Sequence, residues 1–195
     1  MGLLPLRNSR HAYGLVAILL HWLMAVAIFG MFGLGVWMRT LGYYDRWYHA
    51  APELHKSVGM VLLLVLLIRW LWRLANPLPE PRGAPWECIL ARLVHRLHYL
   101  LLFALMATGY LIPTAKGAGI ALFGVATVPA LTTLDAHSAD LIGAIHRYLA
   151  WAVVVLAGFH AAAAMKHHWI NRDDTLLRML GLARHHDTTT EEVSP

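Results

Sequence analysis

The sequence predicts an all-α integral membrane protein, a four-transmembrane-helix bundle, on three observations. Of its 195 residues, 58% are hydrophobic and only 14% are charged. The mean hydropathy is +0.54, which is not the profile of a soluble domain. Four segments also carry the apolar run of near-transmembrane length that a spanning helix needs, at residues 13–38, 55–74, 93–112 and 141–165.

The distribution of Lys and Arg predicts the topology, because these residues accumulate on the cytoplasmic side of a membrane. Threading the four spans places on one side Arg7, Arg10, Arg69, Arg73, Arg82, Arg92, Arg96, Lys166, Arg172, Arg178 and Arg184, and on the other Arg39, Arg46, Lys56, Lys116 and Arg147. Both termini are therefore expected in the cytoplasm (N-in, C-in). The pI near 9.7 does not indicate nucleic acid, since the basic residues form no block.

The segments between and after the spans complete the expected organisation. The first span is expected to be retained and not cleaved at Ala25-Val26-Ala27, because its apolar run continues to Trp37. Residues 113–140 are too broken for another span and are expected to fold over the periplasmic mouth. Residues 171–174 are expected to cap a short amphipathic helix, 175–182, on the inner membrane surface. We expect one domain, 1–182, and a polar tail, 183–195.

The metal-ligand inventory consists mainly of histidine. A single cysteine, Cys88, excludes an internal disulfide and an iron–sulfur cluster held by this chain, whereas there are thirteen histidines. His146 and His160 are separated by about 21 Å of helix and nearly four turns, so they emerge from one face at two depths. Either residue alone could be a hydrogen-bonded core histidine. A metal cofactor at each depth would satisfy both, because a polar side chain in hydrocarbon needs a partner.

Depth predicts the partners of these two histidines. Antiparallel threading places His55 level with His146 near the outer side, and His21 level with His160 toward the inner side. Two bis-histidine haem sites follow. A porphyrin beside a helix needs space one turn onward, and the residues at i+4 from these four are small: Ala25, Gly59, Ala150 and Ala164. His95 and His98 have Tyr99 and Leu102 there instead.

Two imidazoles on each iron leave no open position, so such haems are expected to carry electrons across the bilayer. Lys56 and Arg147 lie near the expected outer haem, together with Arg39. They are open to three interpretations: propionate partners, lipid headgroup contacts, or charges that steer a small anion.

Four more histidines, His95, His98, His167 and His168, are expected at the inner ends of the third and fourth spans. One interpretation is that they are interfacial and contact water and lipid headgroups. The other is a quinone pocket, because a quinone needs hydrogen bonds to two carbonyl oxygens and a supply of protons on reduction.

Several motifs resemble the bacterial cytochrome b561 family. They are Leu20-His21-Trp22, Leu54-His55-Lys56-Ser57-Val58-Gly59, His95 with Tyr99 and Gly109, His146, Gly158-Phe159-His160-Ala161-Ala162-Ala163-Ala164, His167-His168, and Asp174-Thr175-Leu176-Leu177-Arg178-Met179. The resemblance extends from about His11 to Leu180.

This resemblance implies a di-haem b protein of the bacterial inner membrane and is closest to the superoxide oxidase type. Such enzymes pass electrons from periplasmic superoxide through two b haems to ubiquinone. By that likeness His21, His55, His146 and His160 match the axial ligands, and His95 and His167 match positions associated with the quinone. The alternative is a cytochrome b subunit that connects a periplasmic redox partner, of the hydrogenase or dehydrogenase type, to the quinone pool. A third hypothesis is a haem-binding scaffold without redox turnover.

Overall fold

The structure, a computed structural model, describes residues 4–182. Four long helices make up most of this part of the chain. They are α1 (Leu15–Met38), α2 (Ala50–Ala75), α3 (Pro85–Thr114) and α4 (Ala136–Trp169). All four are long and apolar enough to cross a membrane, which confirms the predicted four-transmembrane-helix bundle. A short hairpin of β1 (Ile120–Leu122) and β2 (Ala126–Val128) and a short helix α5 (Thr175–Met179) complete the fold.

The last three long helices begin earlier than their apolar runs, and in α3 and α4 polar residues stabilise the extra turns. At the start of α3, Pro85 occupies the first turn and the Glu87 carboxylate accepts a hydrogen bond from the Ala84 amide at 2.9 Å. At the start of α4, the Asp135 carboxylate accepts one from the Ser138 amide at 3.0 Å. The apolar run therefore indicates the hydrocarbon-spanning part of each helix and not its ends.

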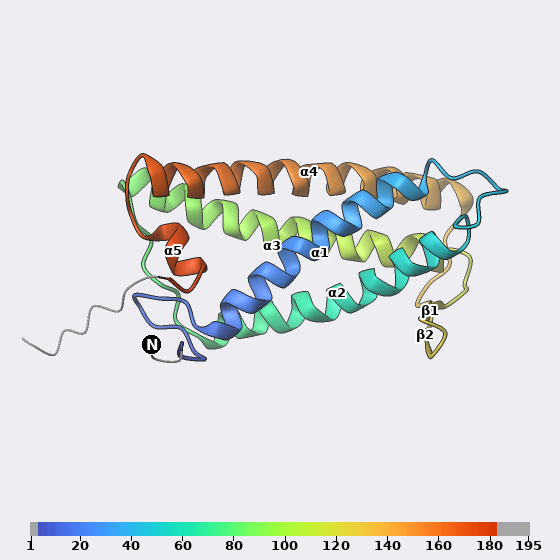
Figure 1. The fold of residues 1–195 in the computed structure, drawn as a ribbon. Helices are drawn as coiled ribbons and strands as arrows, with labels where there is room; N and C mark the ends of the chain where they lie inside the picture. The colour runs from blue at the N-terminus through green and yellow to red at the C-terminus, as the bar shows by residue number, and fades with distance from the viewer. Residues whose placement is uncertain (1–3, 183–195) are drawn as a thin grey trace, which may run out of the picture.

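The elements outside the bundle lie at its two ends (Figure 1). The N-terminal arm, the α2–α3 connector and α5 lie at one end, and the hairpin lies at the other. The first of these is the basic-rich end, so the positive-inside rule assigns it to the cytoplasm. We call the two ends inner and outer. Side chains on the bundle surface include exposed apolar ones such as Val26 and Phe159, as expected of a surface that faces lipid.

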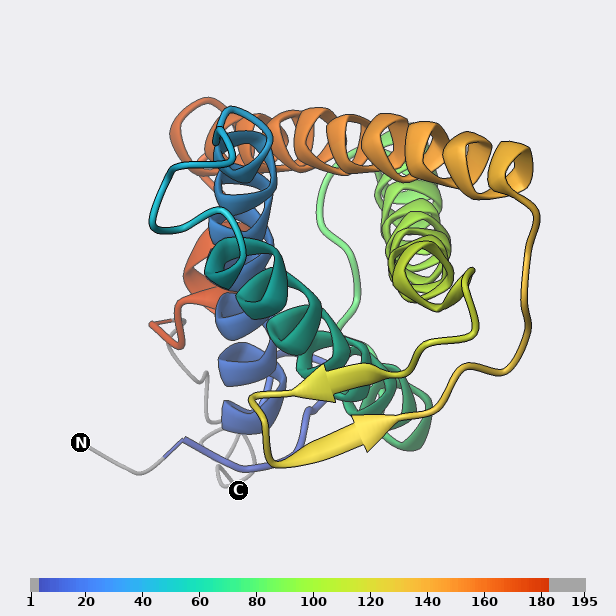
Figure 2. The ribbon, with the colours of Figure 1, turned by 90° about the vertical axis from the view of Figure 1, so that its right-hand side faces the viewer.

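A small apolar core lies at mid-depth in the bundle. Met24 of α1 and Leu62 and Leu66 of α2 are buried together, and Tyr99 and Phe103 of α3 pack against them. The core residues come from α1, α2 and α3, and Figure 2 shows the arrangement of the four long helices as seen from the outer end. The core separates the outer from the inner histidines.

The outer loop, residues 113–140, contains an antiparallel hairpin that the sequence did not predict. Ile120 pairs with Val128 and Leu122 with Ala126, and Phe123 and Gly124 at the turn have φ of 50° and 74°. Two positive φ angles suit a tight hairpin turn. Ser57 of α2 donates a hydrogen bond to the Ala121 carbonyl and accepts one from the Phe123 amide, at 3.0 and 3.1 Å. The hairpin is thereby held against the outer half of α2.

The predicted C-terminal helix is present but shorter than 175–182. It ends at Met179, and Gly181 follows with a φ of +71°. The Asp174 side chain makes no capping hydrogen bond; the Asp173 carboxylate accepts from the Thr175 amide instead, at 2.9 Å. Trp22 Nε1 donates to the Met179 carbonyl at 2.9 Å, which fastens α5 to α1. The predicted polar tail, 183–195, lies outside the described residues.

Candidate functional site

The four histidines predicted as axial ligands lie in the two pairs expected from depth. His55 of α2 faces His146 of α4, and His21 of α1 faces His160 of α4, with ring centroids 6.4 Å apart in each pair. A ligating nitrogen lies about 2.0 Å from its metal and about 1.1 Å from its own ring centroid, so two axial imidazoles have centroids about 6.2 Å apart. Both pairs thus have the spacing of two rings that share one ion.

The neighbouring histidines do not have this spacing. The rings of His95 and His98 both lie beside His160, with centroids at 5.2 and 5.4 Å. These distances are too short for two rings on opposite sides of one ion. The geometry therefore favours His21 as the partner of His160, in agreement with the small residues at i+4.

A large apolar cleft surrounds the outer pair. It encloses about 1050 Å³ of space between the side chains, part of which is open to the surroundings. All four long helices and β1 contribute to its walls, among them Met31, His55, Met106, Ile120 and His146. Gly59 and Ala150, two of the small residues predicted beside the ligands, also line it.

Glycines give the two outer imidazoles their space. A β-carbon at Gly35 would lie 3.2 Å from His55 Cε1, and one at Gly109 would lie 3.0 Å from His146 Cε1. Both distances are shorter than ordinary van der Waals contact. Each ring therefore packs on bare backbone of the adjacent helix.

Hydrogen bonding orients His146 for ligation. Its Nδ1 lies 3.0 Å from the Leu105 carbonyl and 3.2 Å from Thr108 Oγ1. A proton on Nδ1 donated to the carbonyl leaves Nε2 with a free lone pair, the usual arrangement of a metal-bound histidine. His55 Nδ1 is buried and has no hydrogen-bond partner among residues 4–182. The outer residues fit a bis-histidine haem.

The inner pair fits the same spacing but involves an arginine. Arg69 donates to the Leu20 carbonyl at 3.1 Å and to the Tyr99 hydroxyl at 3.2 Å, and its Nη2 lies 3.0 Å from His21 Nδ1. Because arginine can only donate, the proton of a neutral His21 is then on Nε2. If Nε2 of His21 binds a metal, the proton of the neutral ring has to be on Nδ1 instead. The Arg69 guanidinium, which can only donate, would then have to move away from Nδ1.

The paired arrangement itself is informative. Among residues 4–182, no group of three or more His, Cys, Asp or Glu side chains gathers as the ligand set of a single metal ion. Two histidines per site suit a metal whose other ligands come from a porphyrin.

The residues predicted at the inner end are divided between two places. His95 lies against His160, whereas His167 Nδ1 lies 2.6 Å from Asp173 Oδ2 at the end of α4. Lys166, beside His167, forms an ion pair with Glu87 of α3. The sequence did not predict that Glu87 pairs with Lys166, or that Asp173, expected only as part of the helix cap, contacts His167. The available signal was that both are acidic residues within the basic-rich end.

The two outer basic residues also differ in position. Lys56 lines the outer cleft and pairs with Glu53 at 2.5 Å, whereas Arg147 is exposed and its guanidinium lies over the Tyr148 ring at 5.2 Å. Of this pair, Lys56 is the one positioned to act on a molecule entering the cleft.

Comparison with known proteins identifies a family and several relatives. Residues 12–182 match the model of the family described as "Prokaryotic cytochrome b561". "Cytochrome b561 homolog 2" of Escherichia coli (strain K12) is 51% identical over 89% of this chain and 94% of that protein. "Probable superoxide oxidase CybB" of Yersinia pestis is 31% identical over 86% of this chain and 95% of that protein. "Cytochrome b561 homolog 1" of Escherichia coli (strain K12) is 27% identical over 84% of this chain and 93% of that protein.

The match covers the four spans and all the histidines described above. A family of this name consists of membrane cytochromes b, which hold haem b and transfer electrons. With four helices suited to crossing a membrane, paired histidines and a family match over nearly its whole length, this chain belongs to the prokaryotic cytochrome b561 family of multi-pass bacterial membrane proteins.

Proposed function

We propose that the chain is a superoxide:ubiquinone oxidoreductase of the bacterial inner membrane, with two haems b held by His55 and His146 and by His21 and His160. The observation that carries this proposal is the pair of 6.4 Å imidazole spacings at two depths of one bundle. Each haem would supply a one-electron carrier with no open position for oxygen. Net transfer balances when two superoxide anions become two O₂ and one ubiquinone takes two electrons and two protons.

Residues at the inner end support the acceptor. Ubiquinone needs hydrogen-bond donors at its carbonyl oxygens and a route for protons. His167, hydrogen-bonded to Asp173, and His95, beside the inner pair, provide imidazoles at two depths. Lys166, which precedes His167 in the chain, and its ion-pair partner Glu87 are further groups that can carry a proton.

The outer end supports a small anionic donor. Lys56 places a positive charge in the wall of the cleft that contains His55 and His146. The pairing with Glu53 offsets part of this charge. The relative named for superoxide oxidase shares 31% identity, whereas the name of the 51% identical relative states no donor.

A second function is favoured by a different observation. The outer loop between α1 and α2 exposes several aromatic residues: Tyr44 is 98% exposed and Tyr43 is 70% exposed, beside Arg46 and Trp47. Aromatic residues and arginine are enriched in protein interfaces. A periplasmic redox protein, of the hydrogenase or dehydrogenase type, would find a docking surface here, and the chain would then connect it to the quinone pool.

Turnover by the purified haem-loaded protein decides between the two. Superoxide generated in the presence of a ubiquinone analogue should reduce the haems and form quinol, and superoxide dismutase should abolish both signals. Haems that are reduced by dithionite and reoxidised by quinone, yet remain oxidised under superoxide, would indicate the docking function instead. Haems that never cycle would leave only a scaffold role.

A further inference from the structure

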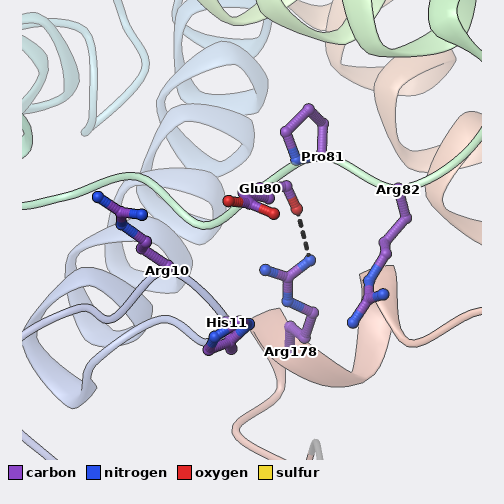
Figure 3. A pocket seen from close by; sticks show the side chains of 6 residues that line it. All are labelled: Arg10, His11, Glu80, Pro81, Arg82 and Arg178. Carbon is purple, nitrogen blue, oxygen red and sulfur yellow. Dashed lines mark hydrogen bonds between the residues drawn. The ribbon is translucent and has the colours of Figure 1, made fainter.

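The inner end contains a basic pocket that takes no part in the electron path described above. It encloses about 430 Å³ of space, part of it open, between three segments that are distant in sequence. Arg10 and His11 come from the N-terminal arm, Glu80 to Arg82 from the α2–α3 connector, and Arg178 from α5. Figure 3 shows the Arg178 side chain rising toward Glu80, with His11 on one side and Arg82 on the other.

Arg178 is the unusual residue of this pocket. It is only 5% exposed, although a buried guanidinium is costly unless it is paired. Its Nη1 donates to the Glu80 carbonyl at 2.9 Å, which is a neutral acceptor. Its Nε is buried and has no hydrogen-bond partner within residues 4–182.

The charges around Arg178 leave room for an anion. The lining residues include three guanidiniums, those of Arg10, Arg82 and Arg178, and one carboxylate, that of Glu80. Arg82 is already paired, because its Nε lies 3.2 Å from Asp174 Oδ1. Arg10 forms no ion pair within the described part of the chain. Arg10 and Arg178 are therefore the two cations available to a ligand, and guanidinium is the side chain best matched to phosphate oxygens.

The position of the pocket indicates where the phosphate comes from. Arg10 lies five residues before α1, and the connector begins directly after α2, so the pocket lies at the level where the spans leave the hydrocarbon. Exposed apolar side chains accompany it on two of its segments, at Leu78 and Leu180. A basic pocket with apolar neighbours at this depth suits a phospholipid whose acyl chains remain in the bilayer.

We propose that this pocket binds the phosphate of an anionic glycerophospholipid in the leaflet at the inner end. The guanidinium groups of Arg10 and Arg178 hold the headgroup phosphate between the N-terminal arm, the connector and α5. This inference goes beyond the electron-transfer function and does not depend on the donor or the acceptor.

Native mass spectrometry of the haem-loaded protein, released from micelles that contain phosphatidylglycerol or phosphatidylcholine, tests the proposal. The wild type should retain phosphatidylglycerol in preference to phosphatidylcholine. Arg10→Gln and Arg178→Gln should each reduce that retention about tenfold, since each removes a charge-assisted contact with the phosphate that Arg7 does not make. Arg7→Gln removes a charge from the same arm outside the pocket and should retain the lipid as the wild type does.

Three results would overturn the lipid assignment. Equal retention of the two lipids by the wild type would remove the selectivity. A loss with Arg7→Gln as large as with Arg10→Gln would show a general charge effect. Thermal stabilisation by inorganic phosphate in lipid-free detergent, equal to that by phosphatidylglycerol and lost in Arg10→Gln, would show that the pocket takes a free anion. Because Arg178 is buried and its replacement can impair folding, the exposed Arg10 variant decides that case.

Discussion

Gly109 of α3 lies so close to His146 of α4 that a β-carbon on the glycine would be 3.0 Å from Cε1 of the imidazole. Because Gly109 has no side chain, the imidazole ring of His146 can approach the backbone of α3 this closely. The contact also positions the ring beside the Leu105 carbonyl, 3.0 Å from Nδ1. The packing of two helices thus determines the orientation of a proposed ligand.

Gly109→Ala should therefore weaken haem retention at the outer site. Overpacking of this kind costs about 1–3 kcal/mol, which corresponds to roughly five- to 150-fold weaker binding. Titration of the apoprotein with haem, followed by absorbance, measures the effect. Gly143→Ala is the matched control, because a β-carbon there meets nothing within 4 Å and the helix-propensity gain is the same. Equal haem affinity in both variants would show that the Gly109 contact is irrelevant to the site.

Replacing any of the four proposed ligands by alanine should reduce the haem content from about two per chain to about one, because each iron would lose half of its protein ligands. His55→Ala and His146→Ala should remove the outer haem, and His21→Ala and His160→Ala the inner one. Pyridine haemochrome assays with low-temperature spectra give the count. His98→Ala should remain near the wild-type spectrum, because its 5.4 Å distance to His160 does not suit axial ligation. A ligand variant that kept both low-spin haems would be removed from the set.

Ionic strength should slow the reaction with superoxide if Lys56 attracts the anion. The rate should fall as the Debye length shrinks from about 30 to 8 Å, whereas reoxidation by quinone should be nearly independent of salt. Lys56→Gln should flatten the salt dependence with haem content intact. Arg147→Gln should have a smaller effect, because Arg147 is exposed over Tyr148 and does not line the cleft. If the variant that carries both Lys56→Gln and Arg147→Gln kept the wild-type dependence of the superoxide rate on salt, entry at the outer cleft would be contradicted and the docking function favoured.

Acid should loosen the end of α4 through Asp173. Burial by itself raises the pKa of this carboxyl, but hydrogen bonds from Thr175 and His167 outweigh it and hold the pKa below its ordinary value. A lowered pKa contributes stability above the unfolded value of about 3.9, and this contribution is lost as the pH falls through the folded pKa. The protection of the Thr175 amide against hydrogen exchange, measured relative to its intrinsic exchange rate, should therefore fall only at the acid end of a titration.

Asp173→Asn should make the protection of the Thr175 amide, measured relative to its intrinsic exchange rate, nearly independent of pH, because the variant carboxamide has no proton to take up. Asp135→Asn is the control: the pKa of Asp135 is also lowered, by hydrogen bonds from Ser138, but it lies at the other end of the bundle. If Asp135→Asn changed exchange at Thr175 as strongly, the effect would be global unfolding and not a local contact.

The amino-acid sequence by itself determined the membrane class, the number of spans and the pairing of the four central histidines. Hydrophobic length is a one-dimensional property, and helical rise converts residue number into depth, so His55 could be matched to His146 without coordinates. The ends of the helices were harder to predict, because caps such as Asp135 with Ser138 extend α4 beyond its apolar run. The hairpin was missed because each of its strands has only three residues and the side chain that fastens it, Ser57, is 64 residues before Ala121.

Only the tertiary structure decided which side chains face which space. Lys56 and Arg147 look alike in the sequence, yet the rotation of each helix about its axis places one in the cleft wall and the other on the surface. His95 and His167 were expected together, but their separation follows from the packing of α3 against α4 and the turn into α5. The basic pocket around Arg178 unites the N-terminal arm, the α2–α3 connector and α5, which are far apart in the sequence. Such proximities arise from long-range packing, which no local pattern encodes.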